Sequence, residues 1–275
     1  MINIPSRISE RLVSGVKKFQ PVLDSAKTRD INESDTVVII TDMLSYVFGF
    51  DKYSEITSEF AIRGTYCDLA TRIDGKLQYL IEVKAIGCEL KDQYVKQAVD
   101  YAANLGTDWV ILTNGIFWNV YKITFGKPIE KEMVASFDFL QLNPKDSSHL
   151  EMLFCISKEG CNKSVLDEFH SRKQVLSKYF ISNVIISEPI LNAIRKELKK
   201  LEPDVKTEIA QIESIISQEI FKRELLDSEK TNEAKKRINR IVAKQKRVKE
   251  KSKNDSEVPE SPNTDKLIRQ DETKG

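Results

Sequence analysis

Apolar residues recur at helical spacing in some stretches of this chain and at strand spacing in others. The predicted elements of the first 125 residues are helices at 6–19 and 34–48, strands at 55–60, 65–73 and 76–85, a helix at 90–104, and strands at 109–115 and 116–123. Beyond Pro144 only helical spacing remains, so the chain changes character there.

Three glycines mark where these elements turn or end. Asp74-Gly75 and Asn114-Gly115 each separate two strand-like runs, which is the pattern of a tight hairpin. Gly106 follows the helix at 90–104 and is a suitable C-cap. A helix placed between two hairpins predicts an α/β unit, in which a mixed sheet is flanked by helices.

The second half of the chain predicts helices of decreasing apolar content. Packed helices are expected at 150–157 and 164–181, and a longer helical run at 188–226 is interrupted at Pro203. The predicted organisation is an N-terminal helix and lead-in at 1–30, an α/β domain at 31–160, an α-helical C-terminal region at 161–228, and a basic, largely disordered tail at 229–275.

Composition excludes several classes of protein. Of the 275 residues, 40% are hydrophobic and 31% are charged, and no apolar run is long enough to span a bilayer. The first 15 residues lack the apolar core of a signal peptide, and the four cysteines form no disulfide or zinc pattern. We therefore expect a cytoplasmic protein with no membrane partner. The chain has two histidines, too few to favour a histidine-based metal site or Ser-His-Asp catalysis.

The candidate chemistry lies on the first predicted hairpin. Asp68 is followed, after thirteen residues, by Glu82-Val83-Lys84. Side chains two residues apart on a strand point to the same face, so Glu82 and Lys84 project together. Carboxylates are ligands for Mg²⁺, and a neighbouring ammonium can offset charge in a phosphoryl transition state. The pattern is typical of a metal-dependent phosphodiesterase.

The hairpin register decides whether Asp68 joins Glu82. A two-residue loop at Asp74-Gly75 pairs Asp68 with Ile81 and leaves the two carboxylates on opposite faces. A three-residue loop that includes Ile73, or a β-bulge, brings them to one face. The phosphodiesterase hypothesis therefore predicts an odd loop or a bulge in this hairpin.

The same residues also fit a structural alternative. Glu82 and Lys84 could form a solvated ion pair on the exposed face of a half-buried edge strand, opposite a core face that carries Tyr79, Ile81 and Val83. A Glu-x-Lys pattern alone favours this alternative, because short motifs recur by chance. Asp68 at hairpin distance strengthens the catalytic hypothesis without deciding it.

Several segments together resemble a known family, the N-terminal nuclease domain of type I restriction enzyme R subunits, within the PD-(D/E)XK superfamily. The segments that carry the resemblance are INESDT with Glu33, SEFAIRG with Glu59, TYCDLA and YLIEVKA with Asp68, Glu82 and Lys84, KQAVDYA with Gln97 and Tyr101, and WVILTNGIFWNVY. The resemblance covers about residues 30–125 and implies a restriction-endonuclease-like α/β core.

The resemblance implies a role for each matching residue. Asp68 and Glu82 would bind Mg²⁺, for which Mn²⁺ may substitute, and Lys84 would position water or steady the transition state. Gln97 and Tyr101 would line the site near the phosphate backbone. Glu33 would be a further ligand or an orienting base, although a carboxylate at a helix N-terminus has an equally good structural explanation. Glu59 fits a structural salt bridge better.

Two features depart from the family pattern. Cys67 stands where the superfamily motif has proline, a substitution that puts little in doubt. The chain also has no GxxxxGK[ST] loop, and so it lacks the ATP-driven motor of R subunits. It resembles stand-alone proteins that keep only the nuclease-like domain.

The resemblance implies an Mg²⁺-dependent endonuclease that acts on nucleic acid, with duplex DNA and a role in restriction or phage defence as the expectation. The alternative is a catalytically silent DNA-binding or assembly subunit with the same fold. The basic run at 235–253, with ten basic residues and one acidic residue, could bind phosphates or be a solvated tail. The helical region could mediate a homodimer, and a separate partner subunit is compatible with the sequence.

Overall fold

The computed structural model describes residues 2–62, 65–126 and 129–254, and the side chains of residues 62, 65, 97, 101, 103, 104 and 244–254 lie outside this description. The chain divides into two compact units, Met1–Arg172 and Lys173–Gly275.

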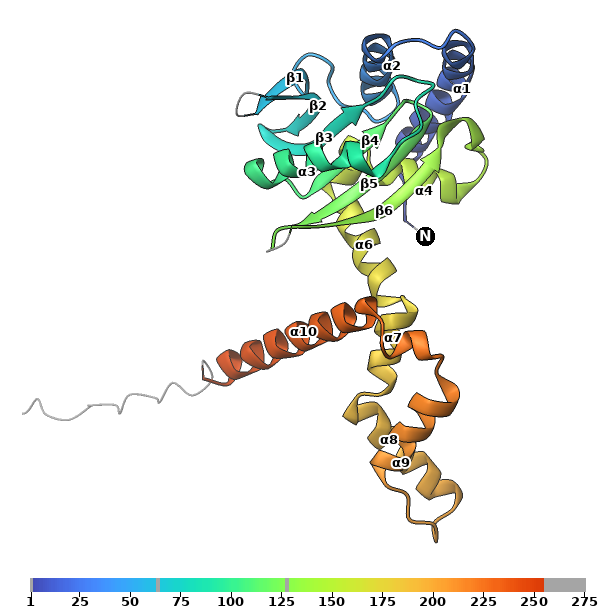
Figure 1. Cartoon of the computed structure of the whole chain (residues 1–275), viewed down its shortest axis with the longest axis vertical. Helices are drawn as coiled ribbons and strands as arrows, with labels where there is room; N and C mark the ends of the chain where they lie inside the picture. The colour runs from blue at the N-terminus through green and yellow to red at the C-terminus, as the bar shows by residue number, and fades with distance from the viewer. Residues whose placement is uncertain (1, 63–64, 127–128, 255–275) are drawn as a thin grey trace, which may run out of the picture. The chain divides into compact units, whose positions relative to one another are not determined.

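The first unit is built on one six-stranded sheet (Figure 1). Its strands, in spatial and sequence order, are β1 (Ile56–Ile62), β2 (Thr65–Ile73), β3 (Lys76–Val83), β4 (Trp109–Thr113), β5 (Phe117–Thr124) and β6 (Glu130–Asp138). β3 and β4 are parallel, and all other neighbours are antiparallel. The predicted α/β class with a mixed sheet is confirmed.

Helices cover both faces of this sheet. The helices of this part of the chain are α1 (Ser6–Thr28), α2 (Glu33–Tyr46), α3 (Asp92–Leu105), α4 (Ser147–Cys155) and α5 (Lys158–Asn162), with a 3₁₀ turn η1 at Phe139–Gln141. They are followed by α6 (Val165–Val175), of which only Val165 and Leu166 are buried. α1, α2 and α4 share one apolar core with the sheet. α3 forms a second core on the opposite face, where Val95 and Ala98 pack with Leu80 and Leu112 (Figure 1). Gly106 caps α3 with a φ of 69°, as predicted.

Helix α1 is longer than the predicted 6–19, and it contains Pro21. Leu23 and Ala26 continue its buried stripe one and two turns past Phe19, so packing favours a longer helix. Proline removes one hydrogen bond, to the carbonyl of Lys17. Both Pro21 and Lys17 are exposed, so that carbonyl faces water and the helix continues.

Strand β6 was not predicted, because its residues do not alternate cleanly. A register shift between Val120 and Tyr121 interrupts its pairing with β5. Only Val134 and Phe137 are buried in β6, at a spacing of three rather than two. An edge strand with polar residues on much of its length carries a weak signal of this kind.

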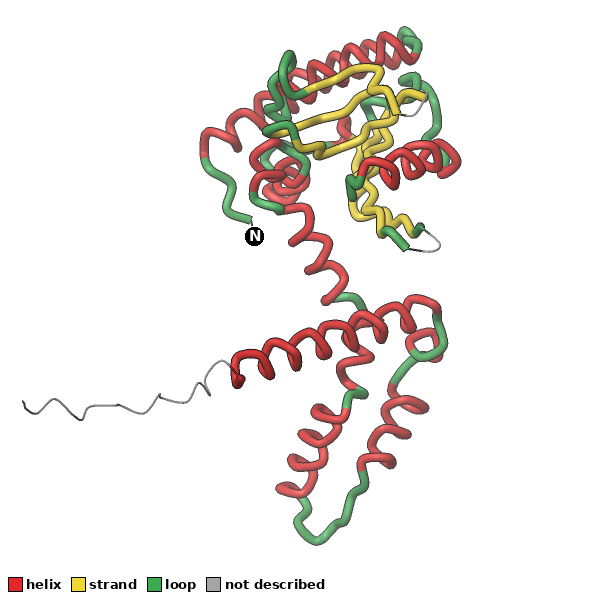
Figure 2. Tube along the Cα trace, turned by 90° about the vertical axis from the view of Figure 1, so that its left-hand side faces the viewer, coloured by secondary structure: helices red, strands yellow, loops and turns green. Residues whose placement is uncertain are grey.

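The second unit is helical (Figure 2). Its elements are α7 (Lys178–Ile185), α8 (Glu188–Leu201), α9 (Ile209–Ile215), a π-helical turn η2 (Ile216–Ile220), a 3₁₀ turn η3 (Arg223–Leu225) and α10 (Glu229–Asn254). α8 ends before Pro203, which confirms the predicted break, and pairs with α9 around Leu191, Ile212 and Ile216. None of the helices in the described ranges is both long and apolar enough to cross a bilayer.

The expectation of a largely disordered tail fails for its first part, since Glu229–Asn254 is a 26-residue helix. This segment has too few apolar residues to form a core, but it contains neither glycine nor proline. Lysine, arginine, glutamate, glutamine and alanine are all good helix formers, so a polar composition does not exclude a helix. Residues 255–275 lie outside the described part of the chain.

Candidate active site

The β2–β3 hairpin has a tight turn and a β-bulge. Asp74 and Gly75 both adopt positive φ, 51° and 75°, which is the geometry of a two-residue type I′ turn. Next to the turn Arg72 pairs with Leu77, but Thr71 pairs with Tyr79. Gln78 is therefore the extra residue of a bulge on β3. The three-residue loop is wrong and the bulge is confirmed.

The bulge sets the register of the candidate residues. Beyond it Ala70 pairs with Leu80 and Leu69 with Ile81, and the ladder ends there, directly before Asp68 and Glu82. Without the extra residue Asp68 would face Ile81, with its side chain on the other face from Glu82. The backbone N–H of Val83 donates to Asp68 Oδ2 at 2.7 Å, which holds the carboxylate at the end of the hairpin.

Glu82 and Lys84 are not on an exposed edge. β3 lies between β2 and β4, and α3 covers the face that carries Leu80 and Glu82. Glu82 is 6% exposed, and the Lys84 side chain is 15% exposed. The solvated ion pair on a half-buried strand is therefore contradicted. Burying an ion pair costs desolvation free energy, so the pair is weak support for stability and a better indication of a functional site.

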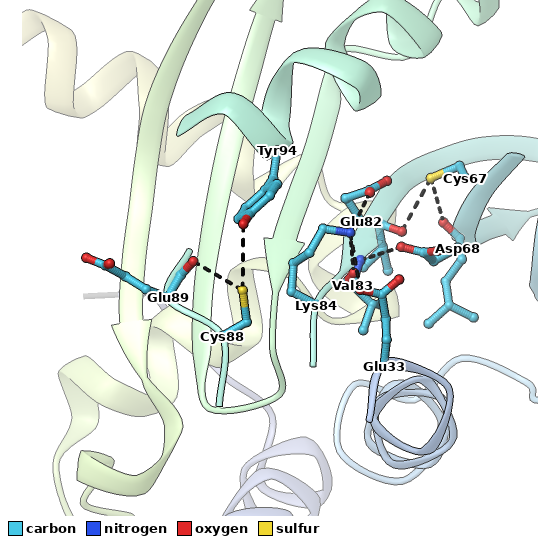
Figure 3. A network of polar contacts seen from close by, with 11 residues as sticks. Glu33, Cys67, Asp68, Glu82, Val83, Lys84, Cys88, Glu89 and Tyr94 are labelled. Carbon is cyan, nitrogen blue, oxygen red and sulfur yellow. Dashed lines mark hydrogen bonds and ion pairs between the residues drawn. The ribbon is translucent and has the colours of Figure 1, made fainter. Parts of the chain in front are cut away.

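The Lys84 ammonium lies among oxygens (Figure 3). Its Nζ donates to Glu82 Oε1 and to the Val83 carbonyl, each at 2.8 Å. Glu33, at the first position of α2, places its Oε2 3.5 Å from the same ammonium. The backbone N–H of Lys84 donates to the Thr113 carbonyl at 2.9 Å, which ties the site to β4. Strand β3 and the start of α2 thus supply the oxygens around one cation, and β4 holds the backbone that carries it.

Three carboxyl groups surround a single ammonium, and their pKa values reflect this imbalance. Burial raises the pKa of Asp68, and the hydrogen bond from Val83 and the charge of Lys84 only partly offset it. Burial and the charge of Asp68 raise the pKa of Glu82 despite its contact with Lys84. Burial alone would lower the pKa of Lys84, but the neighbouring carboxylates outweigh it and the pKa is raised. The site is short of positive charge.

Cys67 precedes this cluster and is chemically quiet. It is fully buried, and its thiol donates to the Ile81 carbonyl at 3.3 Å. Burial raises the pKa of Cys67 to about 12, so the thiol stays neutral near neutral pH. Its part is structural, as expected for a small buried side chain.

Residues outside the hairpin contribute unequally. Gln97 and Tyr101 lie one turn apart on α3, but their side chains are outside the described part of the structure. Tyr94, which sequence reasoning missed, has its ring 5.5 Å from Lys84 Nζ. Its spacing of three residues from Gln97 was the available signal. Glu59 is exposed on β1 and takes part in none of the cluster's described contacts.

Asn114 is a second residue that sequence reasoning assigned only to a turn. Its side chain is buried, and its Nδ2 donates to the carbonyls of Ile86 and Cys88 at 3.1 and 2.9 Å. Its Oδ1 accepts from the backbone of Ile116 and Phe117. Asn114 thus ties the segment that follows Lys84 to the β4–β5 turn.

Asn114→Ala should lower the free energy of unfolding by about 2 to 3 kcal/mol, because it leaves buried backbone groups without partners. Urea unfolding measures the change. Asn119→Ala is the control: the Asn119 side chain bonds the side chains of Ser136 and Tyr121 near the surface and leaves no buried backbone group unpaired, so its loss should cost about 1 kcal/mol or less. Equal losses in the two variants would contradict the role assigned to Asn114.

The raised pKa of Asp68 predicts a pH-dependent stability. A raised pKa means that the folded protein favours the neutral form of the Asp68 carboxyl. The neutral carboxyl therefore contributes its full stability below the ordinary pKa of about 4, and this contribution is lost as pH rises through the raised pKa. In the metal-free chain, Asp68→Asn should therefore raise the melting temperature at neutral pH and have little effect below about pH 4. The amide oxygen of the introduced asparagine can still accept from Val83. A melting-temperature difference that does not change with pH would contradict this.

The comparisons leave the family open. Neither models of known protein families, nor curated proteins, nor solved structures match this chain. The resemblance to restriction-enzyme nuclease domains therefore stays a prediction.

Within the described residues, no group of three or more His, Cys, Asp or Glu side chains has the arrangement of a metal centre.

Proposed function

We propose that this chain is a divalent-cation-dependent phosphodiesterase that cleaves nucleic acid at the Asp68, Glu82 and Lys84 site. The observation that carries the proposal is the half-buried Lys84 ammonium, held by buried Glu82 and the Val83 carbonyl at the end of a central strand. Removing most of an ion pair from water on an interior strand costs free energy, and functional sites are where such costs are commonly retained.

The order of elements supports a PD-(D/E)XK core for this domain. The hairpin that carries the three residues is followed by α3 and then by β4, which is parallel to β3. Glu82 and Lys84 lie at the carboxyl end of β3, beside the end of β4. Ligand sites in α/β sheets favour the carboxyl ends of parallel strands, so this edge is where a substrate would bind.

The donor set fits Mg²⁺ or Mn²⁺. The carboxylates of Asp68 and Glu82 and the carbonyl of Val83 are oxygen donors, and Mg²⁺ takes oxygen ligands together with several waters. The Lys84 ammonium already contacts two of these groups, so a cation is tolerated there. Asp68 and Glu82 would hold the ion, with Glu33 as a further donor or as a base that orients water. When bound, the ion would activate water and offset charge on the phosphate.

The protein's own residues would carry the remaining work. When substrate binds, the Lys84 ammonium would leave Glu82 and the Val83 carbonyl and donate to a phosphate oxygen instead. There it would stabilise the negative charge that develops in the transition state. The ring of Tyr94 beside Lys84 and the α3 residues Gln97 and Tyr101 would line the approach of the backbone. Duplex DNA as substrate, and a role in restriction or phage defence, rest on the family resemblance alone.

A cleavage assay tests the proposal. The full chain is incubated with plasmid DNA, single-stranded DNA and RNA, each with Mg²⁺ or Mn²⁺ and with a chelator in parallel. Cation-dependent scission of at least one substrate, abolished by the chelator, is the expected result. No scission of any substrate would sink the enzyme hypothesis and favour a catalytically silent binding or assembly subunit with this fold.

A further inference from the structure

The last described helix of the second unit, α10, carries a charge that the candidate active site does not use. Residues 235–253 of α10, called here the basic segment, contain ten lysines and arginines and one glutamate. At about 1.5 Å per residue the segment is about 28 Å long. Its net charge of +9 amounts to one positive charge per about 3 Å, close to the one negative charge per about 3.4 Å on each strand of a nucleic-acid duplex.

The basic segment begins where the anchored part of the helix ends. Thr231 is buried; its carbonyl accepts from Asn183 of α7 at 3.3 Å, and its hydroxyl donates to the Leu225 carbonyl at 3.0 Å. From Lys235 on, the described side chains are mostly exposed. Because the first turn of α10 is anchored, the basic segment that follows is held as a helix and not as a flexible chain.

The described cations of this segment lack internal partners. Lys235, Lys236 and Arg240 are exposed, Arg237 is half-buried, and none of the four forms an ion pair with a residue that the structure describes. Like charges four residues apart, such as Lys236 and Arg240, destabilise a helix. A bound polyanion would remove that repulsion.

We infer that the basic segment of α10 binds the phosphodiester backbone of a nucleic-acid duplex, without reading its sequence. The choice of nucleic acid among polyanions rests on the proposed function. The described apolar side chains of α10 are few and small, namely Ala234, Ile238, Ile241, Val242 and Ala243, and residues 229–254 contain no aromatic residue. Helices that lie on membranes use broad faces with tryptophan, phenylalanine or leucine, so a phosphate backbone fits better than a lipid surface.

The test compares two variants of the full chain with the same change of charge. One replaces Lys235, Lys236, Arg237 and Arg240 by glutamine, and the control replaces Arg195, Lys196, Lys199 and Lys200 of the exposed helix α8 by glutamine. Glutamine keeps helix propensity. Fluorescence anisotropy with labelled DNA and RNA duplexes of about 30 base pairs, in chelator and between about 50 and 200 mM salt, gives affinities and salt slopes without cleavage.

The α10 variant should bind at least about ten-fold more weakly and lose about 3 to 4 from the salt slope, since each neutralised phosphate contributes about 0.9. The α8 variant should bind nearly as the native chain does. Binding of both duplexes indicates backbone contact alone, and binding of one identifies the source of the phosphates; either supports the inference. No duplex binding, equal losses in the two variants, or binding to phosphatidylserine vesicles in place of duplexes would overturn it.

The two proposals fail separately. A chain that binds duplexes through α10 but cleaves nothing would sink the active site and leave this inference intact. If the chain cleaves nucleic acid in a cation-dependent way but the α10 substitutions do not change its duplex binding, the active site stands and the inference about α10 is overturned.

Discussion

Lys84→Met should lower the rate of cation-dependent cleavage by about 100- to 1000-fold, the usual cost of removing one group that stabilises transition-state charge. Methionine keeps most of the volume and apolar length of lysine, so packing beside the Tyr94 ring is preserved. Steady-state cleavage of the best substrate from the assay measures the change. Cation binding should persist, because the carboxylates remain and the competing ammonium is gone.

The matched control is Lys76→Met, a substitution on the same strand but at its exposed end beside the turn. It should leave the cleavage rate within about two-fold of the native rate, since exposed charges contribute little. If Lys84→Met keeps native activity while remaining folded, Lys84 is not in the active site. If both variants lose activity equally, the loss reflects the hairpin and not the chemistry.

Asp68→Asn should weaken Mn²⁺ binding by at least about ten- to hundred-fold, because even the outer partners of metal ligands are worth that much. The substitution removes the charge but keeps an oxygen that can accept from Val83, so the hairpin register survives. Isothermal titration calorimetry in the absence of nucleic acid measures the affinity directly. Cleavage should fall in parallel.

Asp74→Asn is the control for this prediction. Asp74 lies in the exposed turn of the same hairpin with a φ of 51°, a conformation that asparagine tolerates well. It should leave the affinity for Mn²⁺ unchanged. Native-like Mn²⁺ binding by Asp68→Asn would remove Asp68 from the ligand set and, with it, the assigned site.

Much of the first unit follows from local patterns. Both hairpins, α3 and its glycine cap depend on turn chemistry and periodicity that are written in short stretches of sequence. The bulge at Gln78 was predicted indirectly, since the register of a two-residue turn would have separated Asp68 from Glu82. Register thus connects a local turn to the chemistry of the site.

Other features depend on contacts that a local pattern does not contain. The pattern of β3 suggests one exposed face, yet α3 packs on that face and Glu82 is buried, because an element outside the strand decides the burial of the face. The same holds for the buried amide of Asn114 and for the continuation of α1 through Pro21. The sequence does not predict the helix α10, because its polar composition is also typical of a disordered segment.

Only part of the candidate active site could be predicted from the sequence. Asp68, Glu82 and Lys84 could be named from their spacing, but the contact of Lys84 with the Val83 carbonyl involves a backbone atom that no motif displays. The approach of Glu33 depends on where α2 begins. Its N-cap, Asn32, accepts from the Asp35 N–H at 2.9 Å and fixes that start.

A crystal structure of the full chain grown with Mn²⁺, with anomalous scattering data to locate the ion, tests the central claim most directly. The account predicts one strong anomalous peak within ligand distance of the Asp68 and Glu82 carboxylates, with the Lys84 ammonium moved off the Val83 carbonyl. Lys84 still bound to Glu82 and Val83 at saturating Mn²⁺, with no peak between the two carboxylates, would contradict it.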